Sequence, residues 1–193
     1  MDNRSDRTNK TYTKNKMATK FINPSSVMAQ TGLMRGEVVA DLGCGNGFYV
    51  LPAAQLAGPE GEVIAVDVQE SKLAATISIA NQYGYRNIKV VRADLAKPLL
   101  DIPESTVDMV ILSNIMHEIG LGREMLLKNA YRILKTGGKV AVIEWKKELS
   151  PIGPPMDGRL DQEAAEMQMM KAGFRKGKDM QADGYHYAIL FLK

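Results

Sequence analysis

Three glycines at alternate positions follow an acidic residue in the segment Asp41-Leu42-Gly43-Cys44-Gly45-Asn46-Gly47. The apolar residues 38–40 precede this segment, and residues 48–51, which can open a helix, follow it. A buried strand that runs into a glycine loop and then a helix is how an open α/β sheet binds a nucleotide-like ligand. Glycines let the backbone turn sharply and let a ligand lie against the main chain. This segment is therefore the first candidate for chemistry.

The glycine spacing narrows the class of ligand. A dinucleotide-binding fingerprint needs its third glycine three positions after the second, and Phe48 stands there. A phosphate-binding P-loop ends in Gly-Lys-Ser/Thr, and the loop here has no such ending. Both the dinucleotide and the nucleoside triphosphate interpretations are weakened.

The segment resembles the acid-x-Gly-x-Gly-x-Gly signature of the class I S-adenosylmethionine-dependent methyltransferases, and further acids and turns downstream follow in the expected order. The resemblance covers about residues 36–193 and implies a Rossmann-like α/β fold. Its sheet would have seven mostly parallel strands with an antiparallel C-terminal hairpin, and helices would cover both faces. Within this class the chain is most similar to the small-molecule group that includes ubiquinone/menaquinone-type methyltransferases, but it is shorter than those enzymes, and their substrate does not carry over.

Acidic residues stand where several predicted strands end. Asp41, Asp67 and Asp94 would share one crevice, because ligands of open α/β sheets sit outside the carboxyl ends of the strands. Three carboxylates there would repel a phosphate. They suit a ligand with hydroxyls, an adenine amine and two positive centres. S-adenosyl-L-methionine has these groups, so it is the predicted cofactor.

The resemblance assigns the adenosine side to five residues. Asp67 would bond both ribose hydroxyls, and Val68 would pack on the adenine face. Asp94 would accept from the adenine amine, with backbone and apolar contact from Ala93 and Leu95. Each acid also has a purely structural alternative: Asp67 could cap a helix, and Asp94 could start a turn.

The methionine side is assigned in the same way. Asp41 would orient the methionine ammonium, and the backbone at Ser113 would touch it. Gly43, Gly45 and Gly47 would allow close approach of the methionine portion.

One histidine stands beside the predicted acceptor position. His117 is the candidate general base, since the unperturbed pKa of histidine lies near 6.5. The alternative is that it only packs against, or bonds to, the cofactor or a neighbouring residue. Glu118 could orient it or face solvent, and this pair is too small for a metal site. Cys44 is predicted to be a buried filler, because no group that would activate it as a nucleophile is visible.

Alternating strands and helices must hold these residues in place. We predict strands at 37–42, 62–68, 88–92, 107–113, 139–145, 174–180 and 185–192, and helices at 24–31, 49–57, 70–83, 123–134 and 161–172. The last two strands are joined by too short a turn for a parallel crossover, so they are predicted to be antiparallel. A cap at Ser25 or Ser26, a helix face shared by Leu73, Ile77 and Ala80, and a tight turn at 136–138 are also expected.

Composition is that of a single globular domain. The chain has 193 residues, of which 45% are hydrophobic and 24% charged, and a single cysteine. No apolar run is long enough for a membrane span, and no signal peptide is visible. A cytoplasmic location is the default expectation. Residues 1–20 carry six Lys/Arg against two Asp, which predicts a disordered, solvated basic tail ahead of one methyltransferase domain at 21–193.

The acceptor is less defined than the cofactor. No Asn-Pro-Pro-Tyr-like segment follows residues 107–113, which argues against methylation of nucleobase amines. Residues 21–34 and 150–159 would roof a small pocket, and Trp145, Met156 and Arg159 could line it. A small-molecule acceptor is therefore favoured over nucleic acid. An RNA or protein acceptor held by the tail, a non-catalytic cofactor-binding protein and a nicotinamide dehydrogenase stay open, as do the acceptor atom and the oligomeric state.

Overall fold

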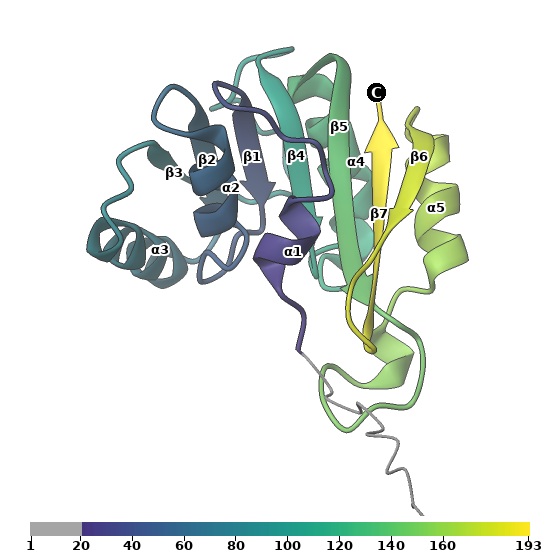
Figure 1. Ribbon diagram of the computed structural model, residues 1–193. Helices are drawn as coiled ribbons and strands as arrows, with labels where there is room; N and C mark the ends of the chain where they lie inside the picture. The colour runs from purple at the N-terminus through teal and green to yellow at the C-terminus, as the bar shows by residue number, and fades with distance from the viewer. Residues whose placement is uncertain (1–20) are drawn as a thin grey trace, which may run out of the picture.

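The computed structural model describes residues 21–193, so the prediction of a disordered tail at 1–20 lies outside the described residues. One sheet runs through the whole described chain, with helices on both faces (Figure 1). The strands are β1 Val38–Leu42, β2 Glu62–Asp67, β3 Ile88–Arg92, β4 Val107–Ser113, β5 Leu134–Trp145, β6 Arg175–Met180 and β7 His186–Leu192. The α-helices are α1 Pro24–Met28, α2 Val50–Ala57, α3 Glu70–Gln82, α4 Arg123–Ile133 and α5 Gln162–Lys171, and short 3-10 turns lie at Gly120–Gly122 and Met156–Gly158.

The strand order is β3-β2-β1-β4-β5-β7-β6. Strands β1 to β5 pair in parallel, whereas β7 runs antiparallel to both β5 and β6. The seven-stranded, mostly parallel sheet with its antiparallel C-terminal hairpin is therefore confirmed. The order reverses between β1 and β4, and a reversal of this kind opens a crevice at the carboxyl ends of the neighbouring strands.

Two apolar layers hold the helices against the sheet. Helices α1, α2 and α3 pack on one face, and α4 and α5 pack on the other, as Figure 1 shows. Strand β1 has buried side chains on both faces. This pattern explains its unbroken apolar run and fixes the position of Asp41 at its end.

One local prediction was wrong, and the structure adds detail to two others. Asn23, rather than Ser25 or Ser26, caps α1 by accepting from the backbone N–H of Ser26. On α3, Leu73 and Ala80 are buried and Ile77 is half-buried, and Thr76 is also buried, with its hydroxyl donating to the carbonyl of Gly45 at 3.1 Å. The predicted tight turn at 136–138 lies inside the span of β5, where Gly137 has φ +79° and the pairing with β4 skips from Leu134 to Lys139.

None of the helices formed by residues 21–193 combines the length and the apolarity needed to cross a membrane.

A buried asparagine ties the loop after β3 to helix α4. The Asn129 carbonyl oxygen accepts from the Leu99 backbone N–H at 2.9 Å, and its amide donates to the carbonyls of Leu95 and Lys97 at 3.3 and 2.8 Å. This loop also carries Asp94, so the position of that acid depends on α4.

We expect Asn129→Ala to lower the free energy of unfolding by about 2–4 kcal/mol, because it leaves several buried backbone groups without partners. Urea unfolding followed by circular dichroism would measure the loss. Lys128→Ala is the matched control, since Lys128 is exposed and makes a surface ion pair with Glu124, and it should change stability by less than about 0.5 kcal/mol. Equal stability of the two variants would contradict the role assigned to Asn129.

Candidate functional site

Two cavities meet at the carboxyl ends of the parallel strands. The first, here called the β2 cavity, has a volume of about 650 Å³. It is lined by residues of the glycine loop, the ends of β2 and β3 and the segment after β4: Gly43, Gly45, Asp67, Val68, Gln69, Lys72, Ala93, Asp94, Leu95, Ile115, Glu118 and Ile119. Seven of the predicted cofactor residues thus share one cavity.

The second, here called the β7 cavity, has a volume of about 590 Å³. Its described lining comes from the segment before α1, the glycine loop, α3, the end of β4 and the β5–β7 edge: Phe21, Ile22, Pro24, Asp41, Gly43, Cys44, Gly45, Asn46, Phe48, Tyr49, Lys72, Ser113, Asn114, Glu118, Trp145 and His186. Gly43, Gly45, Lys72 and Glu118 line both cavities. The two spaces therefore form one crevice divided by the glycine loop.

The loop keeps its shape because two of its glycines leave room for neighbours. Gly43 has φ +84°, and a Cβ there would stand 2.8 Å from the side chain of Ile115. Gly47 has φ +81°, and a Cβ there would stand 2.9 Å from Thr76. Gly45 instead faces open space. Gly47 is therefore a packing position against α3, while Gly43 and Gly45 face the crevice.

Asp67 fixes the loop to the end of β2. One of its carboxylate oxygens accepts from the Gly45 backbone N–H at 3.0 Å, and the other accepts from the Gln69 N–H at 2.9 Å. Each oxygen keeps a further lone pair. The structural alternative for Asp67 is therefore partly realised, and the carboxylate can still accept from a ligand in the β2 cavity.

Asp94 stands across the same cavity. Its side chain accepts from the Ala96 N–H at 3.0 Å, which makes the turn foreseen as its structural alternative. Lys97 also lies 3.3 Å from the carboxylate. Val68, which lines the same cavity, is an exposed apolar residue, so it offers an apolar surface to a ligand.

Asp41 is fully buried beneath the loop. Burial raises the pKa of this carboxyl to about 7, and the negative charge of Asp67 adds to the rise. One of its oxygens has no hydrogen-bond partner among the described residues. A buried carboxylate without partners is unstable, so this position favours a cationic ligand.

Other unpaired polar atoms gather around the same space. The Tyr49 hydroxyl, the Asn114 side-chain oxygen and His186 Nε2 are buried and lack partners within the described chain. All three residues line the β7 cavity. Asn114 also has φ +54°, a conformation that asparagine tolerates better than most residues. Buried polar groups are normally satisfied, so the cluster is characteristic of a ligand site.

His117, the predicted general base, is bonded to a buried acid of β5. Its Nδ1 lies 2.6 Å from a carboxylate oxygen of Glu144, which is buried in β5. The other oxygen of Glu144 accepts from the backbone N–H of Met116 at 2.8 Å. Among residues 21–193, the linings of the two cavities include His186 and not His117. This geometry favours the packing alternative, in which His117 and Glu144 hold the segment after β4.

The predicted roof is only partly in place. Trp145 lines the β7 cavity, whereas Arg159 is buried in the loop after β5. Its guanidinium donates to the carbonyls of Pro154, Lys146, Glu148 and Ile152 and to the Ser150 hydroxyl. Arg159 therefore shapes the loop from within, and Met156 lies on a short exposed turn of that loop.

Sequence reasoning missed several residues of the crevice. Tyr49, Asn114, Lys72 and His186 were not assigned to it, although all four line the β7 cavity. The sequence did carry a signal for the contact that holds His117. Glu144 is an acid inside the apolar run of β5, and a buried acid needs a buried partner. His186 offered no local signal, because it reaches the crevice only through the pairing of β7 with β5.

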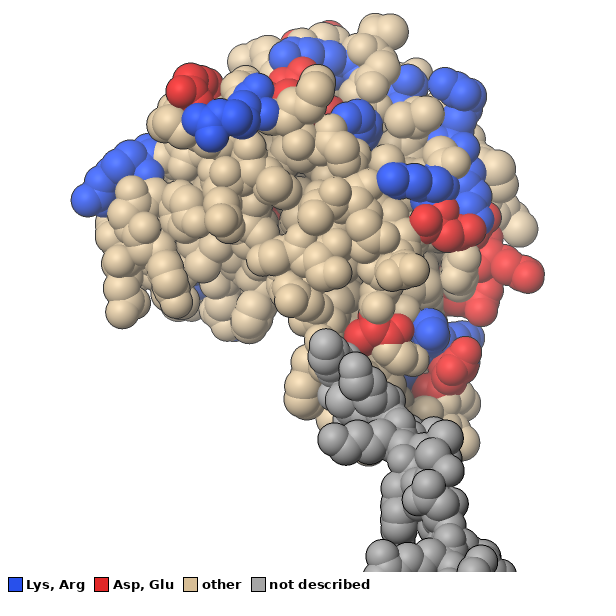
Figure 2. All heavy atoms as spheres, viewed as in Figure 1, with Lys and Arg blue, Asp and Glu red and all other residues tan. Residues whose placement is uncertain are grey.

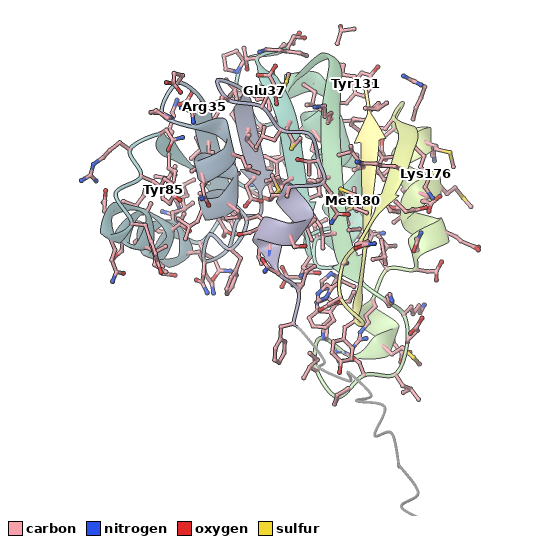
Figure 3. The ribbon with its side chains drawn as sticks, viewed as in Figure 1. Arg35, Glu37, Tyr85, Tyr131, Lys176 and Met180 are labelled. Atoms are coloured by element: carbon pink, nitrogen blue, oxygen red, sulfur yellow. The ribbon has the colours of Figure 1, made fainter. Side chains whose placement is uncertain are left out.

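A cavity of about 600 Å³ lies elsewhere, between the α2–β2 and α3–β3 connections, and includes Arg35 and Tyr85. Figure 3 shows Arg35 at the edge opposite to the carboxyl ends of the parallel strands. Neither of the acids at the strand ends, Asp41 or Asp67, is among its described lining residues. The crevice at the carboxyl ends is therefore the better candidate.

Comparison with known proteins agrees with this geometry. The model of the methyltransferase domain family matches residues 33–187. The chain belongs to this family. Its sequence and fold are those of the class I S-adenosylmethionine-dependent methyltransferases, as the glycine-loop resemblance predicted.

Two curated relatives are both named ubiquinone/menaquinone biosynthesis C-methyltransferase UbiE. The protein from Marinomonas sp. is 30% identical over 126 residues, which cover 65% of this chain and 49% of the relative. The protein from Pasteurella multocida is 31% identical over 120 residues, 62% of this chain and 44% of the relative. The chain therefore spans about half the length of the curated relatives it matches.

A solved structure matches over more of the chain. The crystal structure of a SAM dependent methyltransferase from Aquifex aeolicus is 28% identical, covers 89% of this chain and 90% of its own, and has a TM-score of 0.82. The [4+2]-cyclase SpnF is similar in fold alone, with a TM-score of 0.72 at 17% identity.

We expect stability to depend on pH through Asp41. Its folded-state pKa is about 7 against an ordinary 3.8, so the folded protein binds more protons than the unfolded chain in this window. Stability should therefore fall as pH rises from about 4 to about 7, by at most about 1.4 kcal/mol per pH unit.

Urea unfolding of the wild type and of Asp41→Asn, at about pH 5 and about pH 7.5, measures this effect. The wild type should lose more stability than the variant between the two conditions. Other titrating groups contribute equally to both proteins, so subtracting the loss of the variant from that of the wild type leaves the contribution of Asp41. The same loss in both proteins would contradict the raised pKa of Asp41.

Proposed function

We propose that this protein transfers the methyl group of S-adenosyl-L-methionine to a small-molecule acceptor. The observation that carries the proposal is a crevice edged by three carboxylates, Asp41, Asp67 and Asp94, one of which is buried with an unpaired oxygen. Such an edge favours a cationic ligand and disfavours a phosphate. The cofactor fits this chemistry, since it combines an adenosine with an ammonium and a sulfonium and has no phosphate.

The two cavities suggest how the cofactor divides between them. In the β2 cavity Asp67 would accept from the ribose hydroxyls and Asp94 from the adenine amine, with Val68, Ala93 and Leu95 around the ring. In the β7 cavity Asp41 and the backbone at Ser113 would receive the ammonium. Gly43 and Gly45 line both cavities, so the part of the cofactor that links its adenosine to its ammonium would cross the glycine loop there. Gly47 would support the loop by packing against α3.

The residues of this chain have little covalent chemistry to do. The bound cofactor supplies an electrophilic methyl group on sulfur. The protein must hold an acceptor in line with it and exclude water. Phe21 and Ile22 from the segment before α1, with Pro24 at its start, line the β7 cavity together with Ser113 and Trp145. The acceptor would bind there, beside the methionine end of the cofactor.

The size of the β7 cavity supports a small molecule. Its volume of about 590 Å³ is within the range of small-ligand sites. The curated relatives are named for quinone biosynthesis, which is consistent with a small acceptor. In the view of Figure 2, Lys and Arg lie mainly along the upper rim and the right side, with a smaller group lower on the right, and many of them stand next to Asp or Glu. This mixed distribution does not support nucleic acid as the acceptor.

A protein that binds the cofactor without using its methyl group is the second candidate. One observation favours it: the fold is similar to that of SpnF, which is a [4+2]-cyclase. Transfer of a labelled methyl group from the cofactor to any acceptor would exclude this candidate. A cytoplasmic location stays a prediction from the sequence.

The ribose and adenine assignments can be tested by calorimetry with S-adenosylhomocysteine. We expect Asp67→Asn to weaken binding by about 10- to 100-fold and Asp94→Asn by about 10-fold, because each loses a hydrogen bond to a charged acceptor. Asp101→Asn, an exposed acid in the loop after β3, is the control and should bind as the wild type does. Unchanged affinity in Asp67→Asn, with the fold intact by circular dichroism, would refute the ribose assignment.

A further inference from the structure

The second histidine of the chain lies in the wall of the β7 cavity, where the acceptor is proposed to bind. His186 is the first residue of β7 and pairs with Trp145, the last residue of β5. Its ring lies against the Trp145 ring, with the centroids 4.0 Å apart. The residue is only 4% exposed, and it lines the β7 cavity together with Asp41 and Ser113. It therefore lies beside the space where the methionine end of the cofactor is proposed to bind.

A carboxylate fixes which nitrogen of this imidazole carries the proton. His186 Nδ1 is 2.9 Å from an oxygen of Asp183, and the same oxygen accepts from the backbone N–H groups of Tyr185 and His186. Burial raises the pKa of Asp183, but the hydrogen bonds from His186 and from the Tyr185 backbone outweigh it and hold the pKa below its ordinary value. Since an ionised carboxylate can only accept, we assign the proton to Nδ1. Nε2 then carries a lone pair.

That lone pair has no partner in the described chain. Nε2 is buried and unpaired, like the hydroxyl of Tyr49 and the side-chain oxygen of Asn114 in the same cavity wall. The arrangement of carboxylate, imidazole and unpaired nitrogen is that of a general base whose tautomer is held by a neighbouring acid. His117 differs, because its Nδ1 is bonded to Glu144 outside the two linings.

We propose that His186, held by Asp183, is the general base for methyl transfer to a flat acceptor that carries a phenolic or enolic hydroxyl. This inference rests on the proposed function. The flat shape follows from the cavity wall, where the Trp145 ring stands with Phe21 and Phe48. Both phenylalanines are 72% exposed, which leaves their faces available to an aromatic acceptor.

The charges around the site explain why a held base is needed. Asp41 reaches the cavity from the end of β1, Glu118 from the segment after β4, and Asp183 supports the imidazole. Burial raises the pKa of Tyr49 above its ordinary range; nearby Ser113 opposes the rise, and the charges of Asp41 and Asp183 add to it. Lys72 is the one Lys or Arg among the described lining residues. Surroundings this rich in negative charge disfavour a free phenolate, so the proton must leave as the new bond forms.

The step balances without another reactant. The hydroxyl proton passes from the acceptor oxygen to Nε2 of His186. The electron pair left on that oxygen forms the bond to the methyl carbon, and the pair of the broken carbon–sulfur bond stays on sulfur. The products are a methyl ether, the neutral thioether and a protonated imidazole, which returns its proton to water.

The chain contains two histidines, so imidazole nitrogen NMR of the tag-free, full-length protein can read this site directly. Spectra of His186→Gln and His117→Gln assign the two sets of signals. With S-adenosylhomocysteine present, His186 should show the Nδ1–H tautomer. Its Nε2 signal should then move on addition of 2-naphthol, 4-methoxyphenol or 4-nitrophenol. A proton on Nε2, or no movement with any of the three phenols, would overturn the proposal.

Methyl transfer to phenols of different acidity gives an independent readout. His186→Gln should lose about 10²-fold or more of the rate with 4-methoxyphenol. It should lose far less with 4-nitrophenol, which is ionised in mildly alkaline buffer and needs no base. Asp183→Asn should show the same selectivity, because it removes the acid that holds the tautomer. Equal losses with both phenols, or no loss, would overturn the role of His186.

Binding separates the two levels of inference. If the wild type does not bind S-adenosylhomocysteine by calorimetry, the proposed function fails. If the wild type and His186→Gln bind it equally but no phenol is methylated by the wild type, only the acceptor class and the base are overturned.

Discussion

The structure depends on carboxylates that stand at the carboxyl ends of buried parallel strands. Asp41 is removed from water beneath the glycine loop, next to the charge of Asp67, and one of its oxygens is unpaired in the described chain. Such a position weakens the fold by itself. A cationic ligand would relieve it and a phosphate would make it worse. The same constraint connects the stability of the protein to the class of ligand that it can bind.

The rest of the fold holds this edge in place. Asp67 fixes the glycine loop to β2, Thr76 supports the loop from α3, and Asn129 ties the loop that carries Asp94 to α4. On the other side, the buried pair of Glu144 and His117 anchors the segment after β4. Polar contacts buried between elements, rather than the apolar core alone, therefore set the positions of the residues proposed to meet the cofactor.

Much of this arrangement could be predicted from the sequence, because it depends on local signals. Apolar runs gave the strands, and the acid-glycine segment gave the loop and the family. The sequence is less informative where long-range contacts decide the arrangement. The hydroxyl of Thr76 reaches a loop far away in the chain, and His117 is held by a residue of β5. His186 could not be assigned, since only the antiparallel pairing of β7 with β5 brings it beside Asp41 and Ser113.

The most direct test of the account is a crystal structure of the protein with S-adenosylhomocysteine. The account predicts the ribose hydroxyls on Asp67, the adenine amine on Asp94 and the ammonium beside Asp41. It also predicts that the sulfur faces the cavity that holds His186. Density for the ligand outside this crevice, or an ordered pyrophosphate bound within it in crystals soaked with a dinucleotide, would contradict the electrostatic match at its centre.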